Sequence, residues 1–442
     1  MKDFLFGTLF SFILFLVLLM GFYSQIKSIG DSIADEILEQ KVTQGFRDTN
    51  VTEFYHLPAT TDKKGAYIYN AEKMWGDLTL FSSAGSNMVH LVNHNGSPVH
   101  AWNVSFEEKW PERAEILDKE DGLQHIIPQR VFLTPELNGD IIVIYAFEKG
   151  MIKFDKDSNV VWKSAEEVHH DLYFIDSNSL AALTQERKDQ GHENLPMITG
   201  PYMEEYATIF DRRTGALQKR FPMLEGLYNS PAKEFMKTLH KRPLNHYLPE
   251  GDIIHSNTIT VIPEHIIDKA PMLKKGRALI SARNLDLLYT VNLENGAVEW
   301  ATMGAWHGQH NPRFLENGNI VMFDNLGNFK AGGPSRVIEV ELETGNIVWE
   351  YAGTPEQPLY SMFNAMVEPM PNGNIMVTES LTGRIFELTR DKEVVWEYYA
   401  PERVMFKSPL PAYFDENLER IPSLFSAKRY KREDLKFLSN TN

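Results

Sequence analysis

The chain has 442 residues, 43% of them hydrophobic, with 28 Gly, 23 Pro and no Cys. The absence of cysteine excludes a thiol nucleophile, a zinc–thiolate site and a disulfide framework. The formal net charge of −16 leaves no basic footprint, so nucleic acid is not expected as a partner.

An apolar run lies close to the first residue. Residues 4–23 contain no charged side chain, and this length is enough for a helix to span a bilayer. A cleaved signal peptide is the alternative, but no A-x-A-like site follows the run, and the run is longer than a usual signal core. Lys2 precedes the run and mostly acidic residues follow it. This charge distribution favours an N-terminus on the cytoplasmic side of the membrane and the rest of the chain on the outer side. We therefore expect residues 1–23 to form a membrane anchor that stays attached.

Helical spacing continues behind this run. Apolar residues recur at Ile26, Ile29, Ile33 and Ile37 before a polar stretch begins. We interpret residues 24–62 as a helical stalk and linker. A small element packed on the flank of the next domain fits so short a pattern equally well.

Beyond residue 62 the chain repeats a unit of four short strands. The clearest copy runs from Gln309 to Tyr351 as QHNPRFL, IVMFDN, SRVIEVEL and NIVWEY, separated by turns rich in Asn and Gly. Similar units end in an aromatic residue at Trp102, Trp162, Phe221, Trp300, Trp349 and Trp396. A recurrence at about this spacing is typical of propeller blades. We predict an all-β fold, a six-bladed β-propeller over residues 63–442 with a C-terminal extension, behind an N-terminal transmembrane helix.

Two parts of the chain depart from the regular four-strand repeat. The interval between Phe221 and Trp300 is the widest, and we predict that its segment from Glu225 to Pro249 is an inserted helical lid. The first blade lacks a clear inner strand, so we expect a strand from one terminus to complete it. The sequence leaves open which terminus does so.

The strand assignment predicts a cluster of polar residues at one mouth of the central channel. In a four-stranded blade the first strand is innermost and strand directions alternate, so the start of strand one, the end of strand two and the start of strand three share a face. These positions are occupied by His170, His255, His310, Asn364, Arg283, Asn325 and Arg336. Taken singly, each histidine is more often a hydrogen-bonded structural residue. Together they suit a small tetrahedral oxyanion, because Arg presents a fork of donors and His can donate, accept or attack.

A metal site is the alternative use of such a histidine-rich mouth. Histidine is a common metal ligand, but no E-x-x-H pair and no cluster of carboxylates accompanies the imidazoles. We therefore expect no metal here.

Longer stretches of the chain resemble the aryl-sulfate sulfotransferase family. They are Gly76 to Trp102, Asp252 to Ile262 with ALISARNLD, Gln309 to Tyr351, and PNGNIMVTES with GRIFELTRDKEVVWEY. The resemblance implies a six-bladed propeller that works in the bacterial periplasm and needs neither a nucleotide donor nor another cofactor. It implies transfer of a sulfuryl group from an aryl sulfate to a phenol through a sulfohistidine intermediate. With the anchor, this predicts a single-pass protein of the inner membrane with its propeller in the periplasm.

The resemblance also suggests roles for individual residues. It assigns catalytic positions to His310, His255 and Arg336, and the shared strand position adds His170, Arg283, Asn325 and Asn364 as substrate-binding residues. The histidine that carries the sulfuryl group in the family corresponds best, by blade position, to Asn364, whose amide cannot carry it.

Two readings follow from that replacement. In the first, another imidazole carries the sulfuryl group, and we favour His310 because Gln309 and Asn311 can orient it. In the second, the chain is a catalytically silent propeller that binds a ligand or a protein on the same face. The natural donor and acceptor and the oligomeric state stay open.

Overall fold

A computed structural model describes residues 56–59, 61–121, 126–196, 198–236, 251–328, 333–403 and 419–438. The predicted anchor at residues 1–23 and most of the predicted stalk lie outside these ranges, as do residues 237–250 of the predicted lid. Within the described ranges, no helix combines the length and the apolar character that crossing a bilayer requires.

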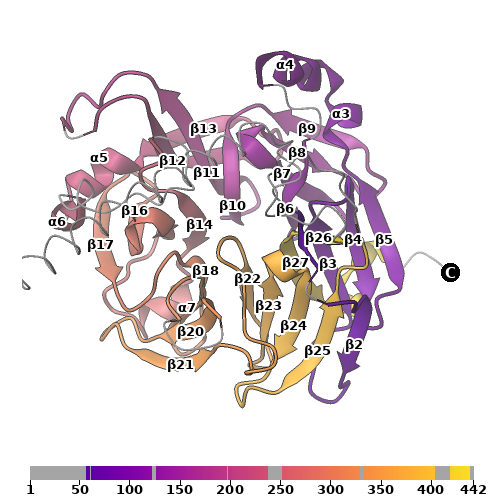
Figure 1. Cartoon of the computed structure of the whole chain (residues 1–442). Coiled ribbons are helices and arrows are strands. Elements are labelled where there is room, and N and C mark those ends of the chain that lie inside the picture. Colours follow the sequence, from indigo (N-terminus) through magenta and orange to yellow (C-terminus); the bar gives the residue numbers. More distant parts are fainter. Residues whose placement is uncertain are drawn as a thin grey trace, which may run out of the picture. The chain divides into compact units, whose positions relative to one another are not determined.

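Six antiparallel sheets surround a common centre, with one strand of each sheet next to it (Figure 1). The predicted six-bladed β-propeller is therefore confirmed. Blades 1 to 3 consist of β27 (Leu424–Tyr430), β3 (Leu78–Ser83), β4 (Met88–Asn93) and β5 (Pro98–Asn103); β6 (Pro128–Leu133), β7 (Ile141–Tyr145), β8 (Met151–Phe154) and β9 (Val160–Ser164); and β10 (Val168–Phe174), β11 (Ser179–Lys188), β12 (Tyr202–Asp211) and β13 (Leu217–Pro222). Blades 4 to 6 consist of β14 (Ser256–Val261), β15 (Arg277–Ala282), β16 (Leu287–Asn292) and β17 (Val298–Met303); β18 (His310–Phe314), β19 (Ile320–Asp324), β20 (Arg336–Val340) and β21 (Ile347–Tyr351); and β22 (Met366–Pro369), β23 (Ile375–Glu379), β24 (Arg384–Leu388), β25 (Val394–Tyr399) and β2 (Gly65–Tyr69).

The aromatic residues that mark the repeat join each blade to the next one. All six lie in the fourth strand of their blade, counted outward from the centre. The Trp102 indole N–H donates to the Gly139 carbonyl in blade 2 at 2.9 Å, and the Trp396 indole reaches the His94 carbonyl in blade 1 at 2.7 Å. An indole suits this place because its body is apolar while its N–H needs an acceptor when buried.

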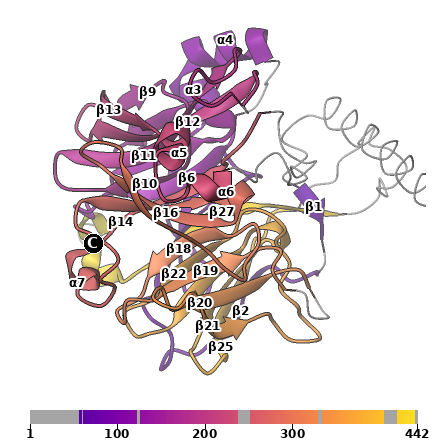
Figure 2. The same ribbon diagram turned by 90° about the vertical axis from the view of Figure 1, so that its left-hand side faces the viewer.

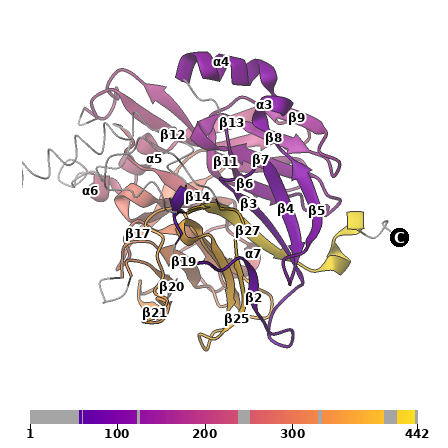
Figure 3. The same ribbon diagram turned by 45° about the vertical axis from the view of Figure 1, so that its right-hand side comes forward.

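Both ends of the described chain take part in closing the ring. β27 pairs with β3 as the innermost strand of blade 1, and β2 pairs with β25 on the outside of blade 6 (Figure 3). Two terminal strands thus contribute, in different blades. A separate pair joins β1 (His56–Pro58) to β26 (Arg420–Pro422), so the first described residues of the predicted helical stalk form a strand.

Short helices occupy the connections between strands. They are α3 (Phe106–Lys109), α4 (Pro111–Asp121), α5 (Met223–Tyr228), α6 (Lys233–Met236), α7 (Glu264–Ile267) and the 3₁₀ turns η1 (Ala146–Glu148), η3 (Arg283–Leu285), η4 (Ser380–Thr382), η5 (Arg432–Asp434) and η6 (Lys436–Leu438). The described part of the predicted lid contains most of α5 and all of α6. Seen from the side, α7 and β1 lie on opposite faces of the propeller (Figure 2).

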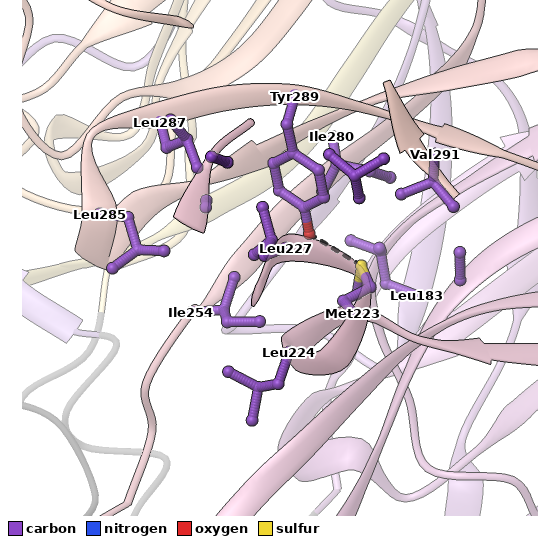
Figure 4. Close-up of a cluster of buried hydrophobic side chains, with 14 of the residues drawn as sticks. Leu183, Met223, Leu224, Leu227, Ile254, Ile280, Leu285, Leu287, Tyr289 and Val291 are labelled. Carbon is purple, nitrogen blue, oxygen red and sulfur yellow. Dashed lines mark hydrogen bonds between the residues drawn. The ribbon is translucent and has the colours of Figure 1, made fainter. Parts of the chain in front are cut away.

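The apolar core is divided among the interfaces between neighbouring blades. Between blades 3 and 4, α5 packs Met223 and Leu227 against Tyr289 of β16, whose hydroxyl donates to the Met223 sulfur at 2.9 Å (Figure 4). Ile254 is buried in the same cluster and directly precedes His255. Its packing therefore fixes the backbone that presents His255 at the start of β14.

Candidate active site

Three of the predicted histidines meet where the inner strands of blades 3, 4 and 5 begin. The rings of His170 and His255 lie edge to face with their centroids 4.9 Å apart. His310 is close enough to interact electrostatically with both. The structure thus brings together three imidazoles that are spread over 140 positions of the chain, from His170 to His310.

Bulges and left-handed residues aim these side chains. His170 has φ +57° inside the bulge that follows His169 in β10, and His255 has φ +50° just before β14. His310 instead pairs with Phe323 and precedes its bulge. The three positions are therefore not equivalent in register, contrary to our expectation from the sequence. They converge because each bulge redirects the strand locally. A left-handed non-glycine residue costs roughly 1–3 kcal/mol, and such strain is concentrated at functional sites.

The protonation of His310 is set by its neighbours. Its Nδ1 lies 3.0 Å from the Gly308 carbonyl and 2.8 Å from Asn325 Oδ1. A carbonyl oxygen can only accept, so Nδ1 carries the proton and Nε2 keeps its lone pair. Burial, followed by the charge of Arg283, holds the pKa of His310 well below its ordinary value. The ring is therefore neutral at neutral pH and has a nucleophilic Nε2.

His255 forms a dyad with a carboxylate that we did not single out in the sequence. Its Nδ1 donates to Asp252 Oδ2 at 2.5 Å. Burial acts to raise the pKa of Asp252, but the charge and the hydrogen bond of His255 outweigh it and lower that pKa. An ionised Asp252 both fixes the His255 ring and stabilises it when it is protonated. The D-x-x-H spacing was the available sequence signal.

A second histidine pair lies behind this dyad. His169 and His170 face each other with their Nδ1 atoms 2.9 Å apart, and both are buried. The two nitrogens share one proton, so both rings cannot be charged together. Burial is the main cause that lowers the pKa of His169 to about 3 and that of His170 well below its ordinary value. His170 therefore faces the site as a neutral ring.

Arg283 is the predicted arginine that lies beside the imidazoles. It opens η3 directly after β15, is 7% exposed, and its charge acts on His310. Within the described ranges it makes one long hydrogen bond, from Nη1 to Asn284 Oδ1 at 3.4 Å, and its buried Nε has no acceptor. A buried guanidinium with unused donors is suited to an anionic ligand.

Arg130 is a second buried guanidinium near the same rings, and the sequence did not suggest it. It is 3% exposed, and its charge acts on both His170 and His310. Its one hydrogen bond within the described ranges goes from Nη1 to the Phe425 carbonyl at 2.5 Å. Burial lowers the pKa of Arg130 to about 10. The bulge between Pro128 and Arg130 turns this residue toward the channel, and no feature of the sequence marks it.

Arg336, expected to be catalytic, is instead held by protein acceptors. Nε donates to Asp324 Oδ2 at 2.8 Å, Nη1 to Glu350 Oε2 at 3.1 Å, and Nη2 to the Ala305 carbonyl at 2.5 Å. The Asp324 carboxylate is fully buried. Each nitrogen thus has a structural partner: the two ion pairs join strands of blade 5, and the hydrogen bond to Ala305 reaches the loop from blade 4.

The two predicted substrate-binding asparagines have different surroundings. Asn325 is fully buried: Oδ1 accepts from His310, and Nδ2 donates to the carbonyls of Ser361 and Asn364 at 2.7 and 2.8 Å. It therefore positions His310 and has no amide group left for a ligand. Asn364 is left-handed, at φ +57°, and its side chain makes no hydrogen bond with the described residues.

Gln309 and Asn311, which we expected to orient the His310 ring, instead form hydrogen bonds with the neighbouring strands. Gln309 donates to Ser281 Oγ at 3.1 Å, and Asn311 Oδ1 accepts from the Val367 N–H at 2.9 Å.

Among the described side chains, no three His, Asp or Glu groups are arranged to hold a metal ion.

Comparison with known proteins adds a family match. A family model described as arylsulfotransferase (ASST) covers residues 137–401, more than half of the chain. No curated protein matches significantly. Similar solved structures include a protein of unknown function from Bacteroides caccae, at 14% identity over 73% of this chain and 93% of that one with a TM-score of 0.42. A streptogramin B lyase matches at 12% identity over 78% and 86% with a TM-score of 0.40. The WD40 β-propeller domain of Doa1 matches at 14% identity over 74% and 76% with a TM-score of 0.38.

Proposed function

Because the chain belongs to the arylsulfotransferase family, we propose that it transfers a sulfuryl group from an aryl sulfate to a phenol by way of a covalent intermediate on His310. The observation that carries this proposal is the geometry of His310. The Gly308 carbonyl holds the ring proton on Nδ1 and leaves Nε2 free to attack. His310 thereby takes the carrier role that Asn364 cannot fill.

In the first displacement, His310 Nε2 attacks the sulfur of the donor. An N–S bond forms and the S–O bond to the aryl group breaks, so the electron pair of that bond leaves on the phenolate. Protonated His255, stabilised by Asp252 at 2.5 Å, donates its Nε2 proton to the phenolate. General acid catalysis of this kind contributes about 10²–10⁴-fold. The sulfated ring keeps its Nδ1 proton on the Gly308 carbonyl and Asn325.

The second displacement reverses these roles. His255, now neutral, removes the proton of the acceptor phenol, whose oxygen attacks sulfur as the N–S bond breaks. Neutral His310 and protonated His255 are restored, and the products are a phenol and a new aryl sulfate. No cofactor is needed for either step.

Arg283 stabilises the charge that develops on the sulfuryl oxygens. Its buried Nε lacks an acceptor, and the charge of Arg283 acts on His310. Preorganised donors aimed at developing charge usually supply the largest catalytic effect. His170 completes the wall of the site as a neutral ring against His255.

The test is to trap the intermediate. The full chain is mixed with 4-nitrophenyl sulfate and no acceptor, and intact mass and peptide mapping are recorded. We expect one added SO₃ group on His310, acid-labile and base-stable, and release of 4-nitrophenol. His310→Ala should lose the adduct, while His265→Ala, at a half-exposed histidine of α7, should keep it. An adduct on another residue refutes the assignment. No adduct and no transfer at all favours the silent, ligand-binding propeller.

We also propose, from the sequence, that residues 1–23 stay attached as an inner-membrane anchor and that the propeller lies in the periplasm. The apolar run and the charges around it support this. Intact mass of the purified protein and protease treatment of spheroplasts test both parts. A mature N-terminus beyond Tyr23 would refute the anchor, and protection from external protease would refute the location.

A further inference from the structure

A cavity opens at the end of the channel opposite the imidazoles, where the inner strands end. Its volume is about 1200 Å³, and it is lined by residues of β6, β10, β18, β22 and β27 together with Pro263 before α7. The imidazoles lie at the starts of the same strands. The cavity is therefore on the face that carries α7, and β1 is on the other face (Figure 2).

Three charged side chains, two of which line the cavity, meet at its floor. Arg313 donates to Asp171 Oδ2 from both Nη atoms at 3.3 Å and to Thr260 Oγ1 at 2.5 Å. Arg130 also interacts electrostatically with Asp171, and both arginines line the cavity. Two guanidinium groups thus share one carboxylate, which leaves the floor with one uncompensated positive charge. Burial of an uncompensated charge is costly, and an anionic ligand would relieve that cost.

The charged residues of the rim, in contrast, are largely paired. Lys428 lies 3.4 Å from Glu368, and Arg390 forms an ion pair with Glu339. The attraction for an anion is therefore concentrated at the floor, at the deepest point of the cavity.

The walls between rim and floor are mostly apolar and aromatic. They include Phe132, Phe174 and Phe314 from three inner strands, with Met366 and Tyr430 beside them. The three phenylalanine rings are only partly buried, so they face the cavity. Aromatic walls favour a planar ring as the partner. The volume is somewhat larger than that of most small-molecule sites, about 300–1000 Å³.

We propose that this cavity binds an aromatic monoanion, with its anionic group on Arg130 and Arg313 and its ring between the phenylalanines. A carboxylate and a sulfate monoester both carry a single negative charge and at least two oxygen acceptors that a guanidinium fork can bind. The inference does not rest on the transfer reaction, because binding at this mouth of the channel involves no bond change, although Arg130 lies near both sites.

Isothermal titration of the full chain with 2-naphthoate tests the proposal, since a carboxylate cannot donate a sulfuryl group. We expect one site per chain. Arg313→Gln should weaken binding at least tenfold, because it removes one of the two guanidinium groups and with it the uncompensated positive charge of the floor. Lys428→Glu changes a half-exposed rim residue and should weaken binding several-fold without endangering the fold. The matched control Lys274→Glu, at an exposed lysine that does not line the cavity, should change binding less than twofold.

Two further arms separate the cavity from the imidazole site and identify the anion. His310→Ala should leave naphthoate binding unchanged, and in this background 2-naphthyl sulfate can be titrated without turnover. Binding of either anion that depends on Lys428 and Arg313 supports the proposal, and the tighter one identifies the natural anionic group. The neutral 2-naphthylmethanol should bind at least tenfold more weakly. Absence of binding at millimolar concentrations, or binding that is lost in His310→Ala but kept in Lys428→Glu, overturns it.

Discussion

Replacing the two arginines of the predicted site one at a time should separate catalysis from stability. Arg283→Gln removes a guanidinium that has one hydrogen bond of 3.4 Å and an unpartnered Nε. Because little native bonding is lost and a buried charge is removed, we expect the free energy of unfolding to change by about 1 kcal/mol or less. The loss of one preorganised donor should lower kcat by about 10²–10³-fold.

Arg336→Gln should show the opposite pattern. Arg336 makes contacts of 2.8, 3.1 and 2.5 Å, and its removal strands the fully buried Asp324 carboxylate without a counter-charge. Breaking a buried ion pair costs about 3–5 kcal/mol. Activity per folded molecule should stay within a few-fold of wild type, because these contacts do not reach the imidazoles.

The assay combines denaturant unfolding with transfer from 4-nitrophenyl sulfate to a phenol, normalised to the folded fraction. The pH profile adds an independent readout: the charge of Arg283 lowers the pKa of His310, so Arg283→Gln should move the acid limb to higher pH. Arg283→Lys should recover part of the rate, since it keeps the charge but not the fork of donors. Loss of activity in folded Arg336→Gln, together with normal activity in Arg283→Gln, would refute this division of roles.

Three other substitutions have equally specific expectations. Asn325→Leu should destabilise the fold by about 1–3 kcal/mol, because it leaves the buried Asn364 carbonyl without its hydrogen-bond donor. It should also lower kcat more than it changes KM, because His310 loses an acceptor that orients its ring. Denaturant unfolding checks the first effect and steady-state kinetics the second. Burial raises the pKa of Glu205 to about 8, so wild type should lose stability as pH rises from about 4.5 to 8. Glu205→Gln should lose less, although Glu148 and Glu204, with pKa values raised to about 7, still contribute; a pH series of thermal melts decides. Burial lowers the pKa of His169 to about 3, so this side chain takes up a proton at higher pH in the unfolded chain than in the folded one. Acidification from pH 6.5 to 5 should therefore cost wild type about 2 kcal/mol more than it costs His169→Gln; urea midpoints at the two pH values measure the difference.

The strands were predictable because their signals are local. Alternating side chains, Asn and Gly turns and a closing aromatic residue lie within one blade, and β18 to β21 match the four runs read from residues 309–351. Four of the closing residues, Trp102, Trp162, Trp349 and Trp396, donate the indole N–H to a carbonyl of the neighbouring blade. A contact that most blades repeat leaves a spacing in the sequence.

The roles of the arginines were not predictable, because they depend on partners that are distant in the chain. Arg336 is neutralised by Asp324 and Glu350, twelve and fourteen positions away, whereas Arg283 ends beside histidines of other blades. Strand position alone places both arginines on one face and cannot tell which finds acceptors. Arg130 was missed for a related reason: a bulge, which no residue type announces, decides that it faces the channel.

The closure of blade 1 has a consequence for how the protein is made. β3 emerges early in synthesis, but its inner partner β27 follows more than 300 positions later. The five other blades can fold as they leave the ribosome, whereas the edge of β3 stays open until β27 arrives. β27 also supplies the Phe425 carbonyl that holds Arg130. A chain whose translation stops early would therefore lack both a closed ring and the carbonyl that holds Arg130. Its open strand edge could pair with other chains, which favours aggregation.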